Sequence, residues 1–146
     1  MNIEFRPFKG EYDWGFCKLH TTLLRVEDTT GIMAIDTDTN TTVGAAIADN
    51  FTPTSCQCHF ILLDPMVLRH GFVETGCDYI FNTLGLQTMY GWVPADNLKA
   101  IKLNKHMGWT IKTVFEEGYM KGVDYLLFEL KKADCKHLEI EQEKVA

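Results

Sequence analysis

The chain has 146 residues, of which 46% are apolar and 23% charged, with a formal net charge of −6 at pH 7. These values are typical of one globular domain with a single hydrophobic core. The negative charge argues against a general nucleic-acid-binding protein, because contacts with phosphates need clustered lysine and arginine. No apolar run approaches the roughly 20 residues that a membrane-spanning helix needs, so we expect neither nucleic acid nor a membrane as a partner.

In the first half of the chain, short apolar runs alternate with turns rich in glycine, proline and hydroxyl side chains. The apolar periods predict, in chain order, a strand at 2–8, a helix at 12–25 and strands at 31–36, 43–48 and 56–63. The strands at 31–36 and 43–48 are separated by the segment Thr37–Thr41, whose side chains can bond their own backbone. We therefore expect these two strands to form a hairpin.

The second half of the chain predicts a helix at 71–84, a strand at 87–93, a helix at 97–107 and closing strands at 109–115 and 124–131. Gly85 should end the first of these helices, and a turn around Gly118 and Gly122 should separate the closing strands. Residues 134–146 are rich in charge, so we expect a domain at 1–133 followed by a charged C-terminal tail.

Five cysteines are present in the sequence: Cys17, Cys56, Cys58, Cys77 and Cys135. Their number is odd and their spacing matches no disulfide framework, and the N-terminal residues lack the basic and apolar segments of a secretory signal. We therefore expect reduced thiols in a cytoplasmic protein. The order Cys56-x-Cys58-His59 suggests a zinc site, but a Cys-x-Cys pair needs two further ligands from elsewhere. Small buried thiols are the simpler interpretation, so no metal site is expected.

The segment from Asn97 to Trp109 has the clearest local pattern in the chain. Asp96 or Asn97 can cap the start of a helix, and Gly108 stands where that helix should stop. Three apolar residues share one face of the predicted helix: Ala100, Leu103 and Met107. Three lysines, which we expect to be solvated, share the opposite face: Lys99, Lys102 and Lys105.

The order Asn-x-x-Ala-x-x-Leu-x-x-x-x-Gly-aromatic in this segment resembles the last motif of the GCN5-related N-acetyltransferases, the acetyl-CoA-dependent GNAT superfamily. The order of predicted elements along nearly the whole chain is also similar to that of GNAT proteins. The run Leu68–Phe72, together with this last motif, weakly resembles small phage-encoded GNAT-like proteins. The resemblance implies an α/β fold with a mixed, mostly antiparallel central sheet of about seven strands and helices on both faces. The family often has a second helix after the first, for which the residues from Val26 to Thr30 leave little room.

A second region of resemblance runs from Leu62 to Val73. In the family a strand ends near a proline, and a turn Arg-x-x-Gly-x-Gly/Ala leads into a helix whose N-terminal N–H groups bind the pyrophosphate of acetyl-CoA. With Pro65 on the family proline, Leu68 stands at the arginine and Gly71 at the first glycine. The resemblance implies that the pyrophosphate contacts the following residues, among which two supply positive charge: Leu68, Arg69, His70, Gly71, Phe72 and Val73.

The resemblance also implies where the acyl group lies. The N–H of Leu63 should bond the acyl carbonyl and steady the tetrahedral oxyanion, and the side chain of Asn97 should lie close to the pantetheine arm. The acetyl group would then move from acetyl-CoA to an amine, on a small molecule or a protein, by direct attack. The alternative is a GNAT-like interaction or structural module without catalysis, for example a phage structural or host-takeover protein.

Several side chains are candidates for handling protons in such a reaction. Many family members have a tyrosine acid at the position of Asn104, which cannot donate a titratable proton at neutral pH. His59 and Asp64, on or at the end of the strand at 56–63, are candidates for the base that deprotonates the amine. Three further carboxylates are equal alternatives for ordering a water or binding a cationic acceptor: Asp36, Asp38 and Glu74.

Overall fold

The computed structural model describes residues 1–21 and 24–138. The elements are β1 (Ile3–Pro7), α1 (Gly10–Cys17), β2 (Thr30–Asp36), β3 (Thr41–Asp49), β4 (Ser55–Leu62), η1 (Pro65–His70), α2 (Phe72–Asp78), η2 (Tyr79–Thr83), β5 (Thr88–Pro94), α3 (Leu98–Met107), β6 (Thr110–Met120), β7 (Val123–Lys131) and η3 (Lys132–Asp134). Within this part of the chain, no helix has the length and apolar character needed to cross a bilayer.

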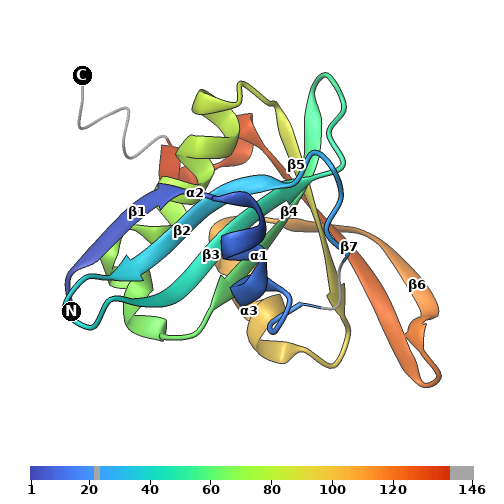
Figure 1. Cartoon of the computed structure of the whole chain (residues 1–146). Coiled ribbons are helices and arrows are strands. Elements are labelled where there is room, and N and C mark those ends of the chain that lie inside the picture. Colours follow the sequence, from blue (N-terminus) through green and yellow to red (C-terminus); the bar gives the residue numbers. More distant parts are fainter. Residues whose placement is uncertain (22–23, 139–146) are drawn as a thin grey trace.

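The strands form one seven-stranded sheet in the order β1-β2-β3-β4-β5-β7-β6 (Figure 1). All neighbouring strands are antiparallel except β4 and β5, which run parallel. A parallel pair needs a crossover connection, and the segment from η1 to η2 provides it. The predicted α/β class, with a mixed and mostly antiparallel sheet of about seven strands, is confirmed.

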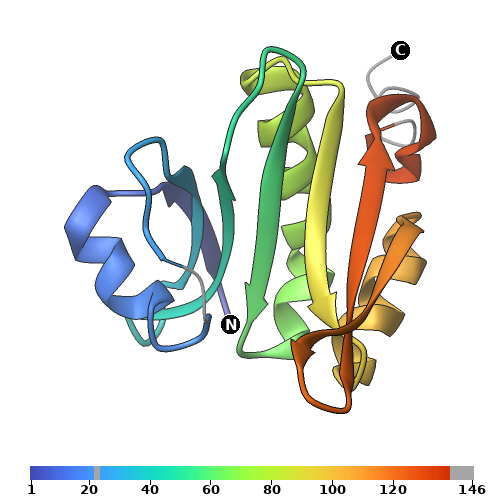
Figure 2. The ribbon, with the colours of Figure 1, turned by 90° about the vertical axis from the view of Figure 1, so that its right-hand side faces the viewer.

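Helices cover both faces of the sheet (Figures 1 and 2). On one face, the α1 residue Cys17 packs with Met33, Ala45 and Ile61. On the other face, α2, η2 and α3 pack against alternate residues of the central strands, with Phe81 and Phe128 fully buried. Because strand side chains alternate between faces, each central strand contributes residues to both cores.

The parallel pair of β4 and β5 ends early. Only three residue pairs join the strands: Ser55 with Thr88, Cys56 with Met89 and Gln57 with Tyr90. Both strands then continue, β4 to Leu62 and β5 to Pro94, without further pairing. Figure 2 shows the two strands diverging toward their C-terminal ends. The backbone edges that face this split therefore lack a strand partner within the described residues.

The helix predicted at 12–25 is wrong in its second half. The observed α1 covers Gly10–Cys17, and the chain leaves it in a turn in which the N–H of His20 donates to the carbonyl of Cys17. Leu19 and Leu24 fit the helical period, but their exposed fractions are 74% and 83%. An apolar period extends a helix only where a core receives it, and residues 22–23 of this range lie outside the described part.

The helix predicted at 71–84 is observed as a continuous helical segment over 72–83, whose second part is π-helical. A 3-10 turn, η1, precedes Gly71, the α-helical part is only Phe72–Asp78, and the π-helical turn η2 completes it. Gly71 adopts φ +82° between η1 and α2, a left-handed conformation that favours glycine. Gly85 adopts φ +72° after η2, as expected of a residue that ends a helix.

The closing hairpin and the C-terminal segment also differ from expectation. β6 continues to Met120, so Gly118 lies within the strand and only Gly122 lies in the turn. Cys135 and Leu138, which the sequence pattern assigned to a charged tail, are 0% and 3% exposed and belong to the main core. Residues 139–146 of the expected tail lie outside the described part of the chain.

A buried ion pair fixes α1 to the first strand. Nη1 and Nη2 of Arg6 donate to the carboxylate of Asp13, at 2.7 and 2.8 Å, and the backbone N–H of Lys9 donates to the same group. Asp13 is only 2% exposed. Burial alone would raise the pKa of Asp13, but the bonds from Arg6 and Lys9 outweigh it, so the pKa lies below its ordinary value. The pair therefore fixes the N-terminal half of α1 against β1.

Replacing Asp13 with asparagine should lower the free energy of unfolding by about 3 kcal/mol at pH 7, because the partly buried Arg6 guanidinium loses its charged partner. The lowered pKa stabilises the fold above the ordinary aspartate pKa, and this contribution is lost as the pH falls through the folded value. Urea unfolding between pH 3 and 7 should therefore show a shallower acid loss in Asp13→Asn than in the unchanged protein. Equal slopes in both proteins would contradict the assignment.

Candidate functional site

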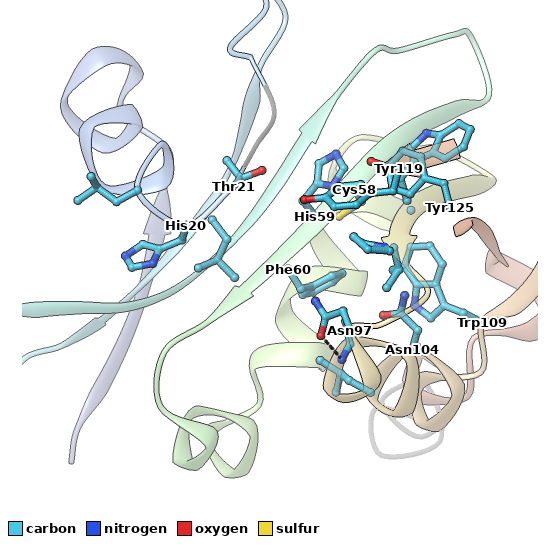
Figure 3. Close-up of a pocket in the computed structure, with 18 residues that line it drawn as sticks. His20, Thr21, Cys58, His59, Phe60, Asn97, Asn104, Trp109, Tyr119 and Tyr125 are labelled. Atoms are coloured by element: carbon cyan, nitrogen blue, oxygen red, sulfur yellow. Dashed lines mark hydrogen bonds between the residues drawn. The ribbon is translucent and has the colours of Figure 1, made fainter. Parts of the chain in front are cut away.

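The split between β4 and β5 contains a cavity of about 480 Å³. Its walls come from the segment after α1, from β4, β5 and α3, and from the β6–β7 hairpin (Figure 3). On β4 and β5, His59 and Trp92 lie on the sheet face that carries α1, since they follow Gln57 and Tyr90 at alternate positions. Asn104 and Trp109 approach from the opposite face. The cavity therefore connects the two faces of the sheet through the split.

The wall formed by α3 follows directly from the local sequence pattern. Asn97 caps α3, its side-chain oxygen accepting a hydrogen bond from the N–H of Ala100 at 3.2 Å. Asn104 lies seven residues later, two turns along the same helix face, and both residues line the cavity (Figure 3). Two residues that the sequence analysis singled out are thus brought together, and the three lysines of the opposite face are exposed as expected.

His59 contributes the only imidazole of the strand walls within the described residues. Its Nε2 atom is shielded from solvent and has no hydrogen-bond partner. Burial lowers the pKa of His59 to about 4. The ring is therefore neutral at pH 7 and offers hydrogen bonding to a ligand without charge. It is a far weaker base than a solvated histidine, so it is poorly suited to take the proton of the amine, the role that the sequence suggested for it.

Trp109 places a second unpartnered polar atom at the cavity. Its exposed fraction is 4%, and its Nε1 donor lacks an acceptor. Gly91 lets the indole approach β5, because a Cβ at that position would lie 3.1 Å from the ring. Within the described residues only one other buried side-chain atom is unpartnered, Glu74 Oε2. Buried polar groups normally have hydrogen-bond partners. Two buried polar atoms without a partner at one cavity therefore indicate a polar ligand.

A row of aromatic rings lines the α1 side of the cavity, and the sequence analysis missed it. The ring centroids of Trp92 and Tyr125 are 5.0 Å apart, and those of Tyr125 and Tyr119 are 5.4 Å apart. Phe115 packs on Trp92 at 5.4 Å. Burial, and secondarily Tyr119, raises the pKa of Tyr125, so its phenol keeps its proton at neutral pH. The alternation of side chains along β5 places Trp92 on one face of the sheet. Its contact with Tyr125 depends on the register between β5 and β7.

The residues of the expected phosphate turn do not line this cavity. Phe72 and Val73 are 2% and 5% exposed and face the core, so the branched side chain of Val73 does not crowd the turn. Leu68 packs at the edge of the main core, and Arg69 and His70 are exposed at the end of η1. A Cβ on Gly71 would meet only side-chain oxygens at 3.9 Å or more, so the space beside this glycine is open.

The backbone N–H of Leu63 points away from the split. It donates to the carbonyl of Val43 at 2.9 Å, toward β3. Consecutive N–H groups of a strand point to opposite edges, so the N–H groups of Phe60 and Leu62 face the split instead. Phe60 also lines the cavity, whereas Leu63 does not. The backbone donor available to a carbonyl in the split is therefore that of Phe60 or Leu62.

The carboxylates that the sequence analysis left open are engaged elsewhere. Asp64 caps η1 by accepting from the N–H of Met66 at 2.9 Å, which is the turn-forming alternative. Asp36 accepts from the backbone of the next turn, and Asp38 pairs with the N-terminal amine. Glu74 contacts His137 at 3.1 Å. None of the four lines the cavity.

The cysteines are buried in the described structure, and none forms a disulfide. Burial raises the pKa of Cys56 to about 12 and that of Cys58 well above its ordinary value, so both remain thiols. Across residues 1–21 and 24–138, no group of three or more histidine, cysteine or acidic side chains could hold a metal ion.

No protein-family model and no curated protein matches the sequence. Solved structures do match the fold. The spermidine/spermine N-acetyltransferase SpeG from Vibrio cholerae, in complex with manganese ions, superposes with a TM-score of 0.74 at 14% identity, over 90% of this chain and 93% of the other. The same enzyme in complex with CoA and spermine gives a TM-score of 0.67 at 17% identity, over 93% and 98%. The chain has the GNAT fold. At these identities the likeness concerns the fold, and the resemblance of the Asn97–Trp109 motif agrees with it.

Replacing His59 tests whether its buried Nε2 atom lacks a partner in the protein. His59→Leu should raise the free energy of unfolding at pH 7 by about 1 kcal/mol, because an unsatisfied buried group is removed. The unchanged protein should lose stability as the pH falls from 6.5 toward the folded value of about 4, since the unfolded histidine gains a proton first. His59→Leu should therefore gain about 2 kcal/mol more at pH 5 than at pH 7.

His59→Gln is the matched control, because glutamine keeps a polar group but does not titrate. Urea unfolding at pH 7 should show no gain for His59→Gln, while its loss between pH 7 and 5 should be as small as that of His59→Leu. A leucine variant less stable than the unchanged protein at pH 7 would indicate that the imidazole has a structural partner.

Proposed function

We propose that the protein is an N-acetyltransferase that moves the acetyl group of acetyl-CoA to a primary amine by direct attack. The observation that carries the proposal is the cavity in the β4–β5 split, which is lined from both faces of the sheet and whose wall residues His59 and Trp109 have unpartnered Nε2 and Nε1 atoms. A cofactor on one face and an acceptor on the other would meet within it. The GNAT fold supports the proposal, as does a neighbour of that fold whose structure contains CoA and spermine.

The α3 side of the cavity suits the cofactor. The N–H groups of Phe60 and Leu62 face the split, where a pantetheine arm with its two amides can take the place of a strand partner. Asn97 and Asn104 offer further amide groups from α3, and Trp109 offers its indole N–H. The pyrophosphate would then lie at the turn from Leu68 to Val73, where Gly71 leaves open space and Arg69 and His70 supply charge.

The α1 side suits the amine. Holding amine and thioester together supplies much of the acceleration, and a backbone donor from Phe60 or Leu62 stabilises the oxyanion. His59, with its pKa lowered to about 4, accepts a hydrogen bond from the amine rather than storing its proton. The thiolate would be protonated by water or by the Tyr125 phenol, since Asn104 has no titratable proton. Asp64 has no part in this scheme.

The non-catalytic module remains the second candidate, favoured by two departures from the family pattern. Leu68 replaces the arginine of the phosphate turn, and Asn104 replaces the tyrosine acid. Such a module would bind a partner or a CoA derivative without releasing free thiol. A cytoplasmic location is also proposed, supported by the five cysteines without disulfides.

Binding of acetyl-CoA tests the proposal directly. At about 100 times the dissociation constant, a ligand specific for the folded state adds about 2.7 kcal/mol, which raises the melting temperature of a domain of this size by roughly 6 to 10 °C. Differential scanning fluorimetry and calorimetry should both detect it. ATP at equal concentration is the control, because it carries the adenine and phosphates without the pantetheine arm. No shift and no heat at millimolar acetyl-CoA would refute the function, and binding without thiol release from any amine would favour the module.

The phosphate turn is tested by paired glycine variants. Gly71→Val and Gly85→Val place a branched side chain at similar left-handed positions, φ +82° and +72°, so both should lose roughly 1 to 2 kcal/mol of stability. Only Gly71→Val should weaken acetyl-CoA binding, by tenfold or more, because its side chain would cover the N–H groups that meet the pyrophosphate. Titration calorimetry beside thermal melts separates the two effects. Equal affinity in both variants would place the pyrophosphate elsewhere.

A further inference from the structure

The acceptor side of the cavity is aromatic and carries no formal negative charge. Among the described residues, its walls include Trp92, Tyr119 and Tyr125 but neither an aspartate nor a glutamate. The rings form a continuous row, with centroid separations of 5.0 and 5.4 Å. His59 adds a neutral imidazole. An acceptor in this part of the cavity would therefore meet flat apolar faces and neutral hydrogen-bonding groups.

Among the residues of β5 and β7, Glu129 is the one carboxylate on this face of the sheet, and it pairs with a lysine. Glu129 lies two residues from Leu127, the register partner of Trp92. Its carboxylate pairs with Lys112 at 3.9 Å. Burial, with the nearby charge of Glu129 as a second cause, raises the pKa of Tyr90. Glu129 does not reach the cavity wall, so it offers no counter-charge there.

We infer that the acceptor is a primary amine with one positive charge on an aromatic or similarly flat apolar body, and not a polyamine. This inference rests on the proposed function. Ring stacking contributes about 0.5 to 1.5 kcal/mol beyond the burial of area, and an ammonium gains further from the ring faces. A second ammonium drawn into the cavity would lose its water without meeting a carboxylate, which is costly.

The reaction balances without another reactant. The neutral amine nitrogen attacks the thioester carbonyl, a C–N bond forms, and the C–S bond breaks. The nitrogen loses one proton to solvent, and the thiolate takes one, so the products are an N-acetyl amine and free CoA. The cavity favours the neutral amine, because no carboxylate stabilises the ammonium form and burial disfavours it.

Three amines separate the ring from the charge: phenethylamine has one amine and a ring, n-butylamine has one amine and no ring, and spermidine has several amines and no ring. We expect kcat/KM for phenethylamine to exceed that for either of the others by at least tenfold, measured as thiol release. Spermidine preferred over phenethylamine, with acetyl-CoA binding intact, would overturn the inference while leaving the proposed transferase in place.

Trp92→Leu should raise the KM for phenethylamine about tenfold while leaving the dissociation constant of acetyl-CoA within twofold. Phe115→Leu is the matched control, since Phe115 contacts Trp92 but is 44% exposed and does not line the cavity. Its KM should stay within twofold. Trp92→Phe, which keeps a ring, should recover most of the loss. An equal rise in Trp92→Leu and Phe115→Leu would show a loosened hairpin and overturn the inference.

Two further measurements keep the outcome decisive. If Trp92→Leu does not fold, Tyr119→Leu removes a ring from the hairpin end of the row and should also raise the KM for phenethylamine. Calorimetric titration of phenethylamine into the protein saturated with CoA reads acceptor binding without turnover. Binding of phenethylamine there supports the inference even if the rate is too low to measure, whereas tighter binding of spermidine overturns it. Failure of acetyl-CoA itself to bind would instead refute the proposed function.

Discussion

The arrangement of this molecule depends on one constraint: in the described sheet, the single parallel pair of strands, β4 and β5, stops pairing after a few residues. β4 and β5 share three residue pairs and then separate. Backbone N–H and C=O groups need partners, so two strand edges left open inside a domain create a demand that a ligand can meet. Trp109 fills the α3 side of the gap, with its ring against Gly91 and near the Cys58 carbonyl that a Cβ on Gly91 would also approach. The cavity is what remains of the split after this packing.

The other elements hold β4 and β5 in place on the two sides of that split. On the β4 side, α1 is tied to β1 by the Arg6–Asp13 pair, and α1 packs on Ile61 of β4. On the β5 side, β7 pairs along the full length of β5 from Thr88 to Pro94, and the hairpin adds the aromatic row. β4 and β5 cannot move together without displacing buried side chains, because well-packed interiors resist small shifts.

The sequence predicted best what depends on local chemistry. The cap by Asn97, the stop at Gly108 and the apolar face of α3 are all local signals, and the helix, its cap and the place of Asn104 on the cavity wall agree with them. The positions of the strands along the chain were predicted from hydrophobic runs, which are also local signals. The turn before α2 was harder, since a 3-10 turn and an α-helical turn share similar apolar spacing.

What the sequence could not provide was register. Trp92 and Tyr125 lie 33 positions apart, and their contact exists only because Pro94 pairs with Tyr125 and Trp92 with Leu127. Likewise, the edge toward which Leu63 points depends on its pairing with Val43 and not on its neighbours in sequence. A shift of one residue would reverse both assignments. Burial of His59 is also a tertiary effect, so its lowered pKa was not readable from the sequence.

The comparison with a spermine-bound neighbour of the same fold shows why the acceptor must be argued from side chains. The fold provides the split, and the split provides a place for a thioester and an amine, but nothing in that arrangement fixes the body of the amine. That choice lies with residues that alternate along β5 and β7 and face the α1 side. In this chain they include large rings, and the carboxylate among them, Glu129, pairs with Lys112. If the acceptor inferred above is right, the same backbone would serve a flat monoamine in this chain, because the charge of a few strand side chains would decide which ammonium groups can leave water.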